Sequence, residues 1–234
     1  LEGFRKRSSG SVSVLGVDPN HGDSAWRNRI GIVLQSTNDA GDLSVNETIA
    51  HFAKYYSSPR KVDEVINAVG LTEKADELIR TLSGGQRRRL DVALGIIGSP
   101  ELLFLDEPTT GFDPEARRAF WALIEDLRKS GTTILLTTHY LDEAEALADR
   151  VAVINHGQII EVATPALLGG RATSLATVSW KGAHGLQSER TDNPTALIRK
   201  LTEIYKDEIP ELTVKRASLE DIYLEMIGGA DVNN

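Results

Sequence analysis

The chain has 234 residues, with 26 lysines and arginines against 34 aspartates and glutamates, and a formal net charge of −8. Apolar residues make up 41% and charged residues 26%, which excludes a disordered or fibrous chain. The acidic balance argues against general binding to nucleic acid or anionic membranes, and the absence of cysteine excludes disulfides, thiolate metal sites and cysteine nucleophiles. No apolar run reaches the roughly 18 residues that a membrane-spanning helix needs.

Short apolar segments alternate with amphipathic ones, a pattern typical of an α/β protein. The expected strands cover residues 11–15, 30–34, 102–106, 132–137, 150–154 and 158–162. The strand 102–106 is apolar on both faces, which indicates that helices cover it on both sides. The sequence Asn155-His156-Gly157 is a turn signal, so the last two strands are expected to pair as an antiparallel hairpin.

Helices are expected between these strands. Ser44-Val45-Asn46-Glu47 reads as a capping box that opens a helix to about residue 56. A second helix covers 60–69 and ends before Gly70, because glycine is a common helix stop. A third begins at Pro114, a favoured first helical residue, and continues until Gly131. Two further helices are expected, at 87–97 and 141–148.

The character of the chain changes near Gly169-Gly170. Beyond this point the pattern predicts a strand at residues 175–180, a polar loop, a helix at 194–205, a strand at 211–216 and a helix at 219–226. We therefore expect a main domain at 1–169 with a helical part at about 40–98, a small α+β accessory domain at 170–228, and a flexible tail at 229–234.

The most informative motif is the apolar strand that ends in Asp106 and Glu107, followed by Pro108. Open α/β sheets bind ligands at the carboxyl ends of their strands. A carboxylate there suits Mg²⁺, and a second one can orient or deprotonate an attacking water. The alternative is a strand that simply ends in solvated acids before a proline turn.

A second motif, Leu82-Ser83-Gly84-Gly85-Gln86, precedes a helical run. Ser83 and Gln86 have capping-box spacing, and the glycines allow a ligand to approach the backbone. A helix N-terminus with free N–H groups suits phosphate. An ordinary capped helix is the alternative. The following Arg87-Arg88-Arg89 is expected to form a solvated, salt-bridged helix face.

Three more residues matter by position. Gln35 follows the strand 30–34, and His139 follows the strand 132–137, so both are expected at the same sheet edge as Asp106. Asp113 lies in a tight turn before a helix, where helix capping is the alternative role. Each of these signals is weak alone.

In this order the motifs resemble the ATP-binding-cassette (ABC) ATPase family, over about residues 10–167. The resemblance implies a P-loop NTPase-like α/β core that uses ATP and Mg²⁺. By this resemblance, Gln35 is the Q-loop glutamine that meets Mg²⁺ and the membrane partner, and residues 82–86 are the signature that contacts ATP. Asp106 is the Walker B metal ligand, and Glu107 is the general base. Asp113 lies in the D-loop, and His139 is the switch histidine at the γ-phosphate.

The same resemblance implies partners and a location. Family members work as head-to-tail dimers with separate membrane subunits, at the inner face of the cell membrane. The ending, residues 217–224, is similar to that of bacterial drug and antibiotic exporter ATPases, although a capped amphipathic helix would look alike. The expected function is therefore ATP hydrolysis coupled to export.

One departure from the family pattern is clear. The Walker A motif, G-x-x-x-x-G-K-[ST], is not found, since no lysine in the sequence follows a glycine. That motif supplies the backbone cradle and the lysine for the β- and γ-phosphates. We expect the chain to begin after that motif and, alone, to bind ATP weakly or not at all.

Two other functions remain open from the sequence. The first is a non-catalytic pairing or regulatory subunit that donates only its signature motif, although Glu107 and His139 have no purpose in such a protein. The second is a soluble ABC ATPase of DNA repair or translation, against which the exporter-like ending and the absence of a long coiled-coil insertion argue.

Overall fold

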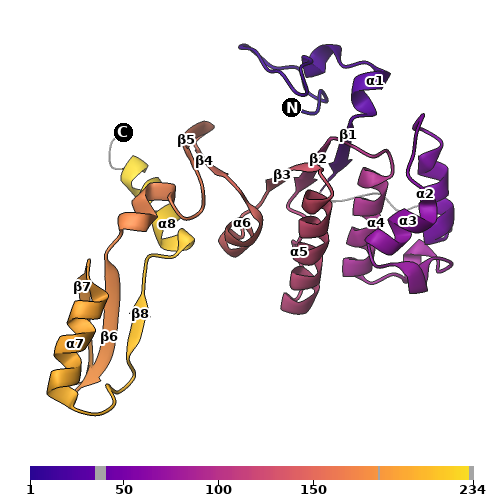
Figure 1. Ribbon diagram of the computed structural model, residues 1–234. Coiled ribbons are helices and arrows are strands. Elements are labelled where there is room, and N and C mark those ends of the chain that lie inside the picture. The colour runs from indigo at the N-terminus through magenta and orange to yellow at the C-terminus, as the bar shows by residue number, and fades with distance from the viewer. Residues whose placement is uncertain (35–40, 184, 232–234) are drawn as a thin grey trace. The chain divides into compact units, whose positions relative to one another are not determined.

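The computed structural model describes residues 1–34, 41–183 and 185–231 (Figure 1). The chain divides into two compact units, Leu1–His139 and Tyr140–Asn234. Among the described residues, no helix combines the length and the apolar character needed to cross a lipid bilayer.

A parallel three-stranded sheet forms the centre of the first unit. Its strands are β1 (Ile30–Val33), β2 (Leu102–Asp106) and β3 (Thr133–Thr137), in the order β1-β2-β3. The pairing of Asp106 with Thr137 fixes the register of the last two strands. All three predicted strands are confirmed, and their carboxyl ends lie at one edge of the sheet.

The middle strand is enclosed as its apolar sequence predicts. Leu103, Phe104 and Leu105 are exposed by 5% or less. On one face, helix α4 approaches β1 so closely that a Cβ on Gly31 would lie 2.1 Å from the carbonyl oxygen of Gly95. Glycine at this crossing therefore allows the helix to pack directly on the sheet.

Among the described residues of the first unit, five α-helices and three short 3-10 helices surround this sheet. They are η1 (Pro19–His21), α1 (Ser24–Arg27), α2 (Val45–Ala53), α3 (Val62–Ala68), η2 (Thr72–Lys74), η3 (Ile79–Thr81), α4 (Gly84–Ile96) and α5 (Pro114–Lys129). Helices α2, α3 and α4 pack on one another (Figure 1) and are the helices expected in the helical part. Helix α5 buries an apolar stripe that includes Phe120 and Ile124.

The helix-end signals in the sequence are confirmed. Ser44 Oγ accepts a hydrogen bond from Glu47 N at 3.1 Å, and Glu47 Oε2 accepts one from Ser44 N at 2.8 Å. Gly70 and Gly131 follow α3 and α5 with φ of 67° and 100°, a left-handed conformation that glycine adopts without steric cost.

The strand predicted at residues 11–15 is wrong. Val14 forms only an isolated bridge with Val17, because the chain turns back between them. Leu15 and Gly16 have φ of 51° and 82°, and Val14 and Val17 exchange both backbone hydrogen bonds. A tight turn has replaced the strand, although Val14 still contributes to a buried cluster with Trp26.

The described residues of the second unit form nine elements in chain order. They are α6 (Leu141–Leu147), β4 (Val151–Asn155), β5 (Gln158–Ala163), η4 (Leu168–Thr173), β6 (Ala176–Gly182), β7 (Gly185–Thr191), α7 (Pro194–Tyr205), β8 (Thr213–Lys215) and α8 (Leu219–Asp231). Strands β4 and β5 form the predicted antiparallel hairpin. The other three form an antiparallel sheet in the order β7-β6-β8, on which α7 packs through Leu197 and Leu201.

Two expectations for this unit need correction. The polar loop predicted after residue 180 contains a strand, β7, which pairs along the whole of β6. Nearly all of its residues are exposed, so it lacks the alternation that marks a half-buried strand. Helix α8 does not end at residue 226 but continues to Asp231, through the first three residues of the predicted tail. Glycine there disfavours a helix by only about 1 kcal/mol per residue, which does not forbid it.

Elements on both sides of Gly169-Gly170 share one core. Leu168, which is 1% exposed, packs with Ala144 and Val153 before the glycines and with Leu219 after them. The domain limits expected at 169 and 228 stay a prediction, because compact packing alone does not define a functional domain.

We expect Leu168→Ala to lower the free energy of unfolding of the second unit by about 3 kcal/mol, because it leaves a cavity in this shared core. Hydrogen exchange measured by mass spectrometry should accelerate in both the β4–β5 hairpin and α8. The matched control is Leu167→Ala, since that neighbour is 58% exposed and should change little. Acceleration in only one of the two segments would contradict a shared core.

Candidate functional site

Two carboxylates lie at the carboxyl edge of the parallel sheet. Asp106 ends β2, and its Oδ1 accepts a hydrogen bond from the Thr137 hydroxyl at the end of β3. The backbone N–H of Glu107 donates to the carbonyl oxygen of Thr137 at 3.0 Å. Glu107 has a φ of 42°, in the left-handed region that non-glycine residues seldom adopt. Strained residues of this kind concentrate at functional sites.

The structure brings His139 to Glu107, as the sequence predicts. His139 Nδ1 lies 3.2 Å from Glu107 Oε1, and the two side chains are 54% and 31% exposed, respectively. Thr110 donates its hydroxyl to the other Glu107 oxygen, Oε2, at 3.3 Å. A histidine and a carboxylate this close together at an accessible edge can orient and deprotonate a water.

The chemistry of this edge fits one magnesium ion. Mg²⁺ is commonly held by one or two carboxylates together with water and phosphate oxygens, so a full protein cage is not needed. Asp106 is exposed and supplies such a carboxylate, oriented by Thr137. Among the residues that the structure describes, no group of three or more histidines and acids comes together to hold a metal. Gln35, the other predicted metal ligand, lies outside the described residues.

The N-terminus of α4 presents the second predicted motif. Ser83 Oγ accepts from Gln86 N at 3.3 Å, and Gln86 Oε1 accepts from Ser83 N at 2.9 Å, so the predicted capping box is formed. Ser83 is exposed, and a Cβ added at Gly84 would meet nothing within 4 Å. The backbone at the start of α4 is therefore open to a phosphate group, which helix N-termini favour.

Asp113 is the helix cap that its position allows. Its Oδ1 accepts from the backbone N–H groups of Glu115 at 2.9 Å and Ala116 at 2.8 Å. The carboxylate thus fixes the start of α5. The role of Asp113 in contact with nucleotide remains a prediction.

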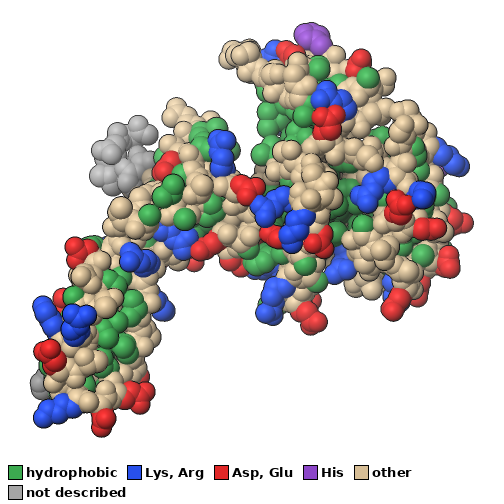
Figure 2. Space-filling model, viewed as in Figure 1, with side chains coloured by type: hydrophobic (Ala, Val, Ile, Leu, Met, Phe, Trp, Pro, Cys, Tyr) green, Lys and Arg blue, Asp and Glu red, His purple; other side chains and the backbone are tan. Residues whose placement is uncertain are grey.

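A cavity of about 500 Å³ lies between the start of α4, the turn after β2 and the start of α5. The predicted site residues on its walls are Ser83, Gly84, Gly85, Glu107 and Asp113. Gln86, Asp106 and His139 are not among its lining residues. Residues 83–85 of the signature and Glu107 therefore line a common space within the first unit. Acidic and basic side chains are interspersed over the surface of this unit (Figure 2).

Sequence reasoning missed Arg88, which was expected on a solvated face. Arg88 is only 7% exposed and donates to the carbonyl oxygens of Asp106 at 2.9 Å and Pro108 at 3.0 Å. The signal was present in the sequence, since Arg88, Val92 and Ile96 recur at helical spacing on the buried side of α4. The run of three consecutive arginines instead favours a solvated helix face, so the buried position of Arg88 was not predicted.

Thr137 was also missed. It is the residue that holds both Asp106 and the backbone of Glu107. A threonine that ends a strand beside two acids is too common a pattern to single out from sequence.

Comparison with known proteins shows the family of the chain. The model of the ABC transporter family matches residues 1–110. The daunorubicin/doxorubicin resistance ATP-binding protein DrrA of Streptomyces peucetius is 34% identical, over 94% of this chain and 76% of that protein. The Nod factor export ATP-binding protein I of Ralstonia nicotianae is 40% identical over 70% of this chain. The match covers 53% of the Ralstonia protein, so the chain spans about half of its length.

A solved structure agrees in fold. The protein cbiO1 from Clostridium perfringens, part of the ABC transporter complex cbiONQ, has a TM-score of 0.64 and 28% sequence identity. The match covers 70% of each chain. It supports the α/β core of the P-loop ABC ATPase type that the sequence predicts.

We expect Ser83→Ala to destabilise the first unit by about 1 kcal/mol, because it removes the N-cap of α4. Ser83→Asp should keep the stability of the original protein, since aspartate caps a helix as well as serine does. Urea unfolding followed by circular dichroism measures both. Ser57→Ala is the control, because Ser57 is exposed outside the helices. An equal loss in Ser83→Ala and Ser83→Asp would show that the cap is not what Ser83 provides.

Proposed function

Because the chain belongs to the ABC transporter family of ATP-binding ATPases, we propose that it is the ATP-hydrolysing subunit of an exporter. The names of its relatives support export, since one is a drug-resistance protein and another exports Nod factor. In this proposal separate membrane subunits carry the substrate, which is drug- or antibiotic-like, and the chain docks on them at the inner face of the cell membrane.

One observation carries the catalytic part of the proposal: Glu107 and His139 meet beside Asp106 at the carboxyl edge of the sheet. Glu107 accepts the proton of a water that attacks the γ-phosphorus of ATP. His139 faces the same phosphate and stabilises the negative charge that develops on it. The β–γ bond breaks, and ADP and phosphate leave.

Asp106 and Gln35 are proposed to hold Mg²⁺. The bound ion would neutralise charge on the β- and γ-phosphates. The hydrogen bond from Thr137 fixes the Asp106 carboxylate in position before the ion binds. Preorganisation of this kind lowers the cost of assembling the site.

We propose that the signature residues act on an ATP held by a second ATPase subunit in a head-to-tail dimer. Ser83, Gly84, Gly85 and Gln86 lie at the exposed N-terminus of α4, where N–H groups and the helix dipole attract phosphate. Asp113 lies on the same cavity, near the proposed subunit contact. The sequence has no lysine that follows a glycine, so within residues 1–234 nothing provides the Walker A grip on the phosphates.

A non-catalytic pairing subunit is the second candidate. Such a subunit would need only the signature residues on α4. Contact between Glu107 and His139 favours the catalytic alternative, because a subunit that only donates its signature does not need a hydrolytic pair.

Two substitutions separate these functions in the assembled transporter. Glu107→Gln keeps the shape of the side chain but removes the base, so ATP turnover should fall roughly a hundredfold or more, with ATP trapped in a closed dimer. Ser83→Asp keeps the helix cap but places a negative charge against the incoming phosphate, so it should prevent dimer closure. Turnover is measured by phosphate release, and trapping by size-exclusion chromatography with radiolabelled ATP.

Glu115→Gln is the matched control, since Glu115 is exposed in the first turn of α5. If Glu107→Gln leaves turnover undiminished while Ser83→Asp abolishes it, the chain is a pairing subunit and Glu107 is not the base. If neither change affects turnover, the proposed site is wrong.

A further inference from the structure

Arg88 is a charged side chain in an almost fully buried position. It lies in the second turn of α4 and is 7% exposed. Burying a charge is costly unless hydrogen bonds replace its water. The guanidinium group finds three backbone carbonyls: Nε donates to Pro108 O at 3.0 Å, Nη2 donates to Asp106 O at 2.9 Å, and Nη1 donates to Leu34 O.

These carbonyls belong to the segments that carry the proposed catalytic groups. Asp106 and Pro108 are the two neighbours of Glu107, so Arg88 holds the backbone on both sides of the proposed base. Leu34 directly follows β1 at the same edge of the sheet. Glu107 itself has a φ of 42°, and such a conformation persists only where the surroundings restrain it.

The charge of Arg88 is fixed in this place. Asp91, one turn further along α4, has a carboxylate oxygen 3.6 Å from Nη1 and is itself 10% exposed on its side chain. Burial lowers the pKa of Arg88, while Asp91 and Asp106 oppose that effect. An arginine nevertheless stays protonated in proteins, so a permanent cation lies beneath the carboxylate edge.

We propose that Arg88 is a positioning residue, which holds the backbone on both sides of Glu107 and ties that base to the helix that begins at the signature motif. The proposal rests on the proposed function, in which Glu107 is the base. It follows that α4 and the Glu107 turn move as one body, so engagement of Ser83 and Gly84 by a partner's ATP is felt directly at Glu107.

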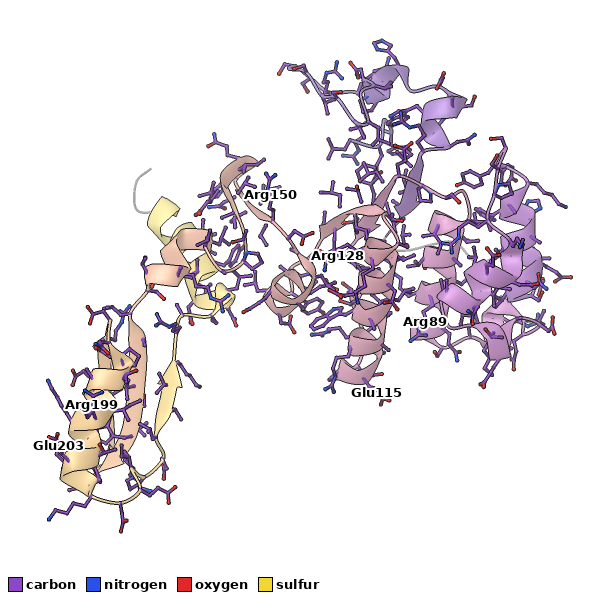
Figure 3. All side chains as sticks on the ribbon, viewed as in Figure 1. Arg89, Glu115, Arg128, Arg150, Arg199 and Glu203 are labelled. Atoms are coloured by element: carbon purple, nitrogen blue, oxygen red, sulfur yellow. The ribbon has the colours of Figure 1, made fainter. Side chains whose placement is uncertain are left out.

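The neighbouring Arg89 provides a matched control for the structural part of this inference. Arg89 lies on the same helix (Figure 3), and its Nη1 donates to the carbonyl oxygen of Val69 at 3.3 Å, at the end of α3. It therefore has the same chemistry as Arg88 but contacts backbone away from the sheet edge.

Hydrogen exchange on the chain itself tests the positioning. In Arg88→Met we expect about tenfold faster exchange at the amides of Glu107 and Thr110, which donate to Thr137 O and Glu107 O, because lost hydrogen bonds to a charged group free this turn. Exchange in the buried part of α5 should not change. Arg89→Met should leave Glu107 and Thr110 unchanged. Arg88→Lys keeps the charge but loses the planar guanidinium group with its several donors, so exchange at both amides should still be faster.

Turnover in the assembled transporter gives the second readout. Arg88→Lys and Arg88→Met should each lower kcat about tenfold and leave the KM for ATP unchanged, because the misplaced base affects the chemical step alone. Arg128→Met, at the exposed far end of α5, should change neither value.

Three outcomes would overturn the inference: unchanged exchange at Glu107 and Thr110, faster exchange throughout Leu1–His139, or a rise in KM in place of a fall in kcat. If Arg88→Met does not fold, Arg88→Lys decides alone. Faster local exchange in Arg88→Lys, together with full turnover in Glu107→Gln, would retain the backbone role of Arg88 and refute the proposed function instead.

Discussion

The parallel pairing of β2 between β1 and β3 determines where Asp106, Glu107 and His139 lie. Because parallel strands end at the same edge of a sheet, the register that pairs Asp106 with Thr137 also places Glu107 beside His139. The middle of β2 is apolar and buried, and it supplies no catalytic group. The proposed hydrolytic groups lie at and just beyond the strand ends, where water and phosphate have access.

A capping box has a structural role in one helix and a proposed binding role in another. The capping boxes of α2 and α4 have the same hydrogen bonds, yet Ser44 is buried and Ser83 is exposed. A buried cap only closes the end of a helix. An exposed cap followed by two glycines leaves N–H groups open to a ligand, so the context of the cap, and not its bonds, supports a role in binding.

The sequence predicts elements well where one physical signal dominates. The strand 102–106 and the helix 194–205 match β2 and α7 at both ends, because continuous apolarity defines the first and a proline at its start the second. The strand β7 has no burial pattern, and the turn at Leu15 and Gly16 competes with local strand propensity, so both escaped prediction. Site residues that follow a predicted strand, such as Glu107 and His139, could be predicted from their position at the sheet edge. The helical spacing of Arg88 indicates its burial but not its role, since its hydrogen-bond partners are carbonyls of segments distant in sequence.

In the proposed head-to-tail dimer an ATP site is divided between two subunits: one provides the signature, and the other provides the Walker A grip on the phosphates, which residues 1–234 lack. Calorimetric titration of Mg²⁺–ATP into the isolated chain of residues 1–234 measures this division directly. A chain that carries no glycine–lysine pair to hold the phosphates should give no saturable heat at millimolar ATP. Tight binding of one ATP per chain would contradict the division and would require a phosphate grip built from other residues of this chain.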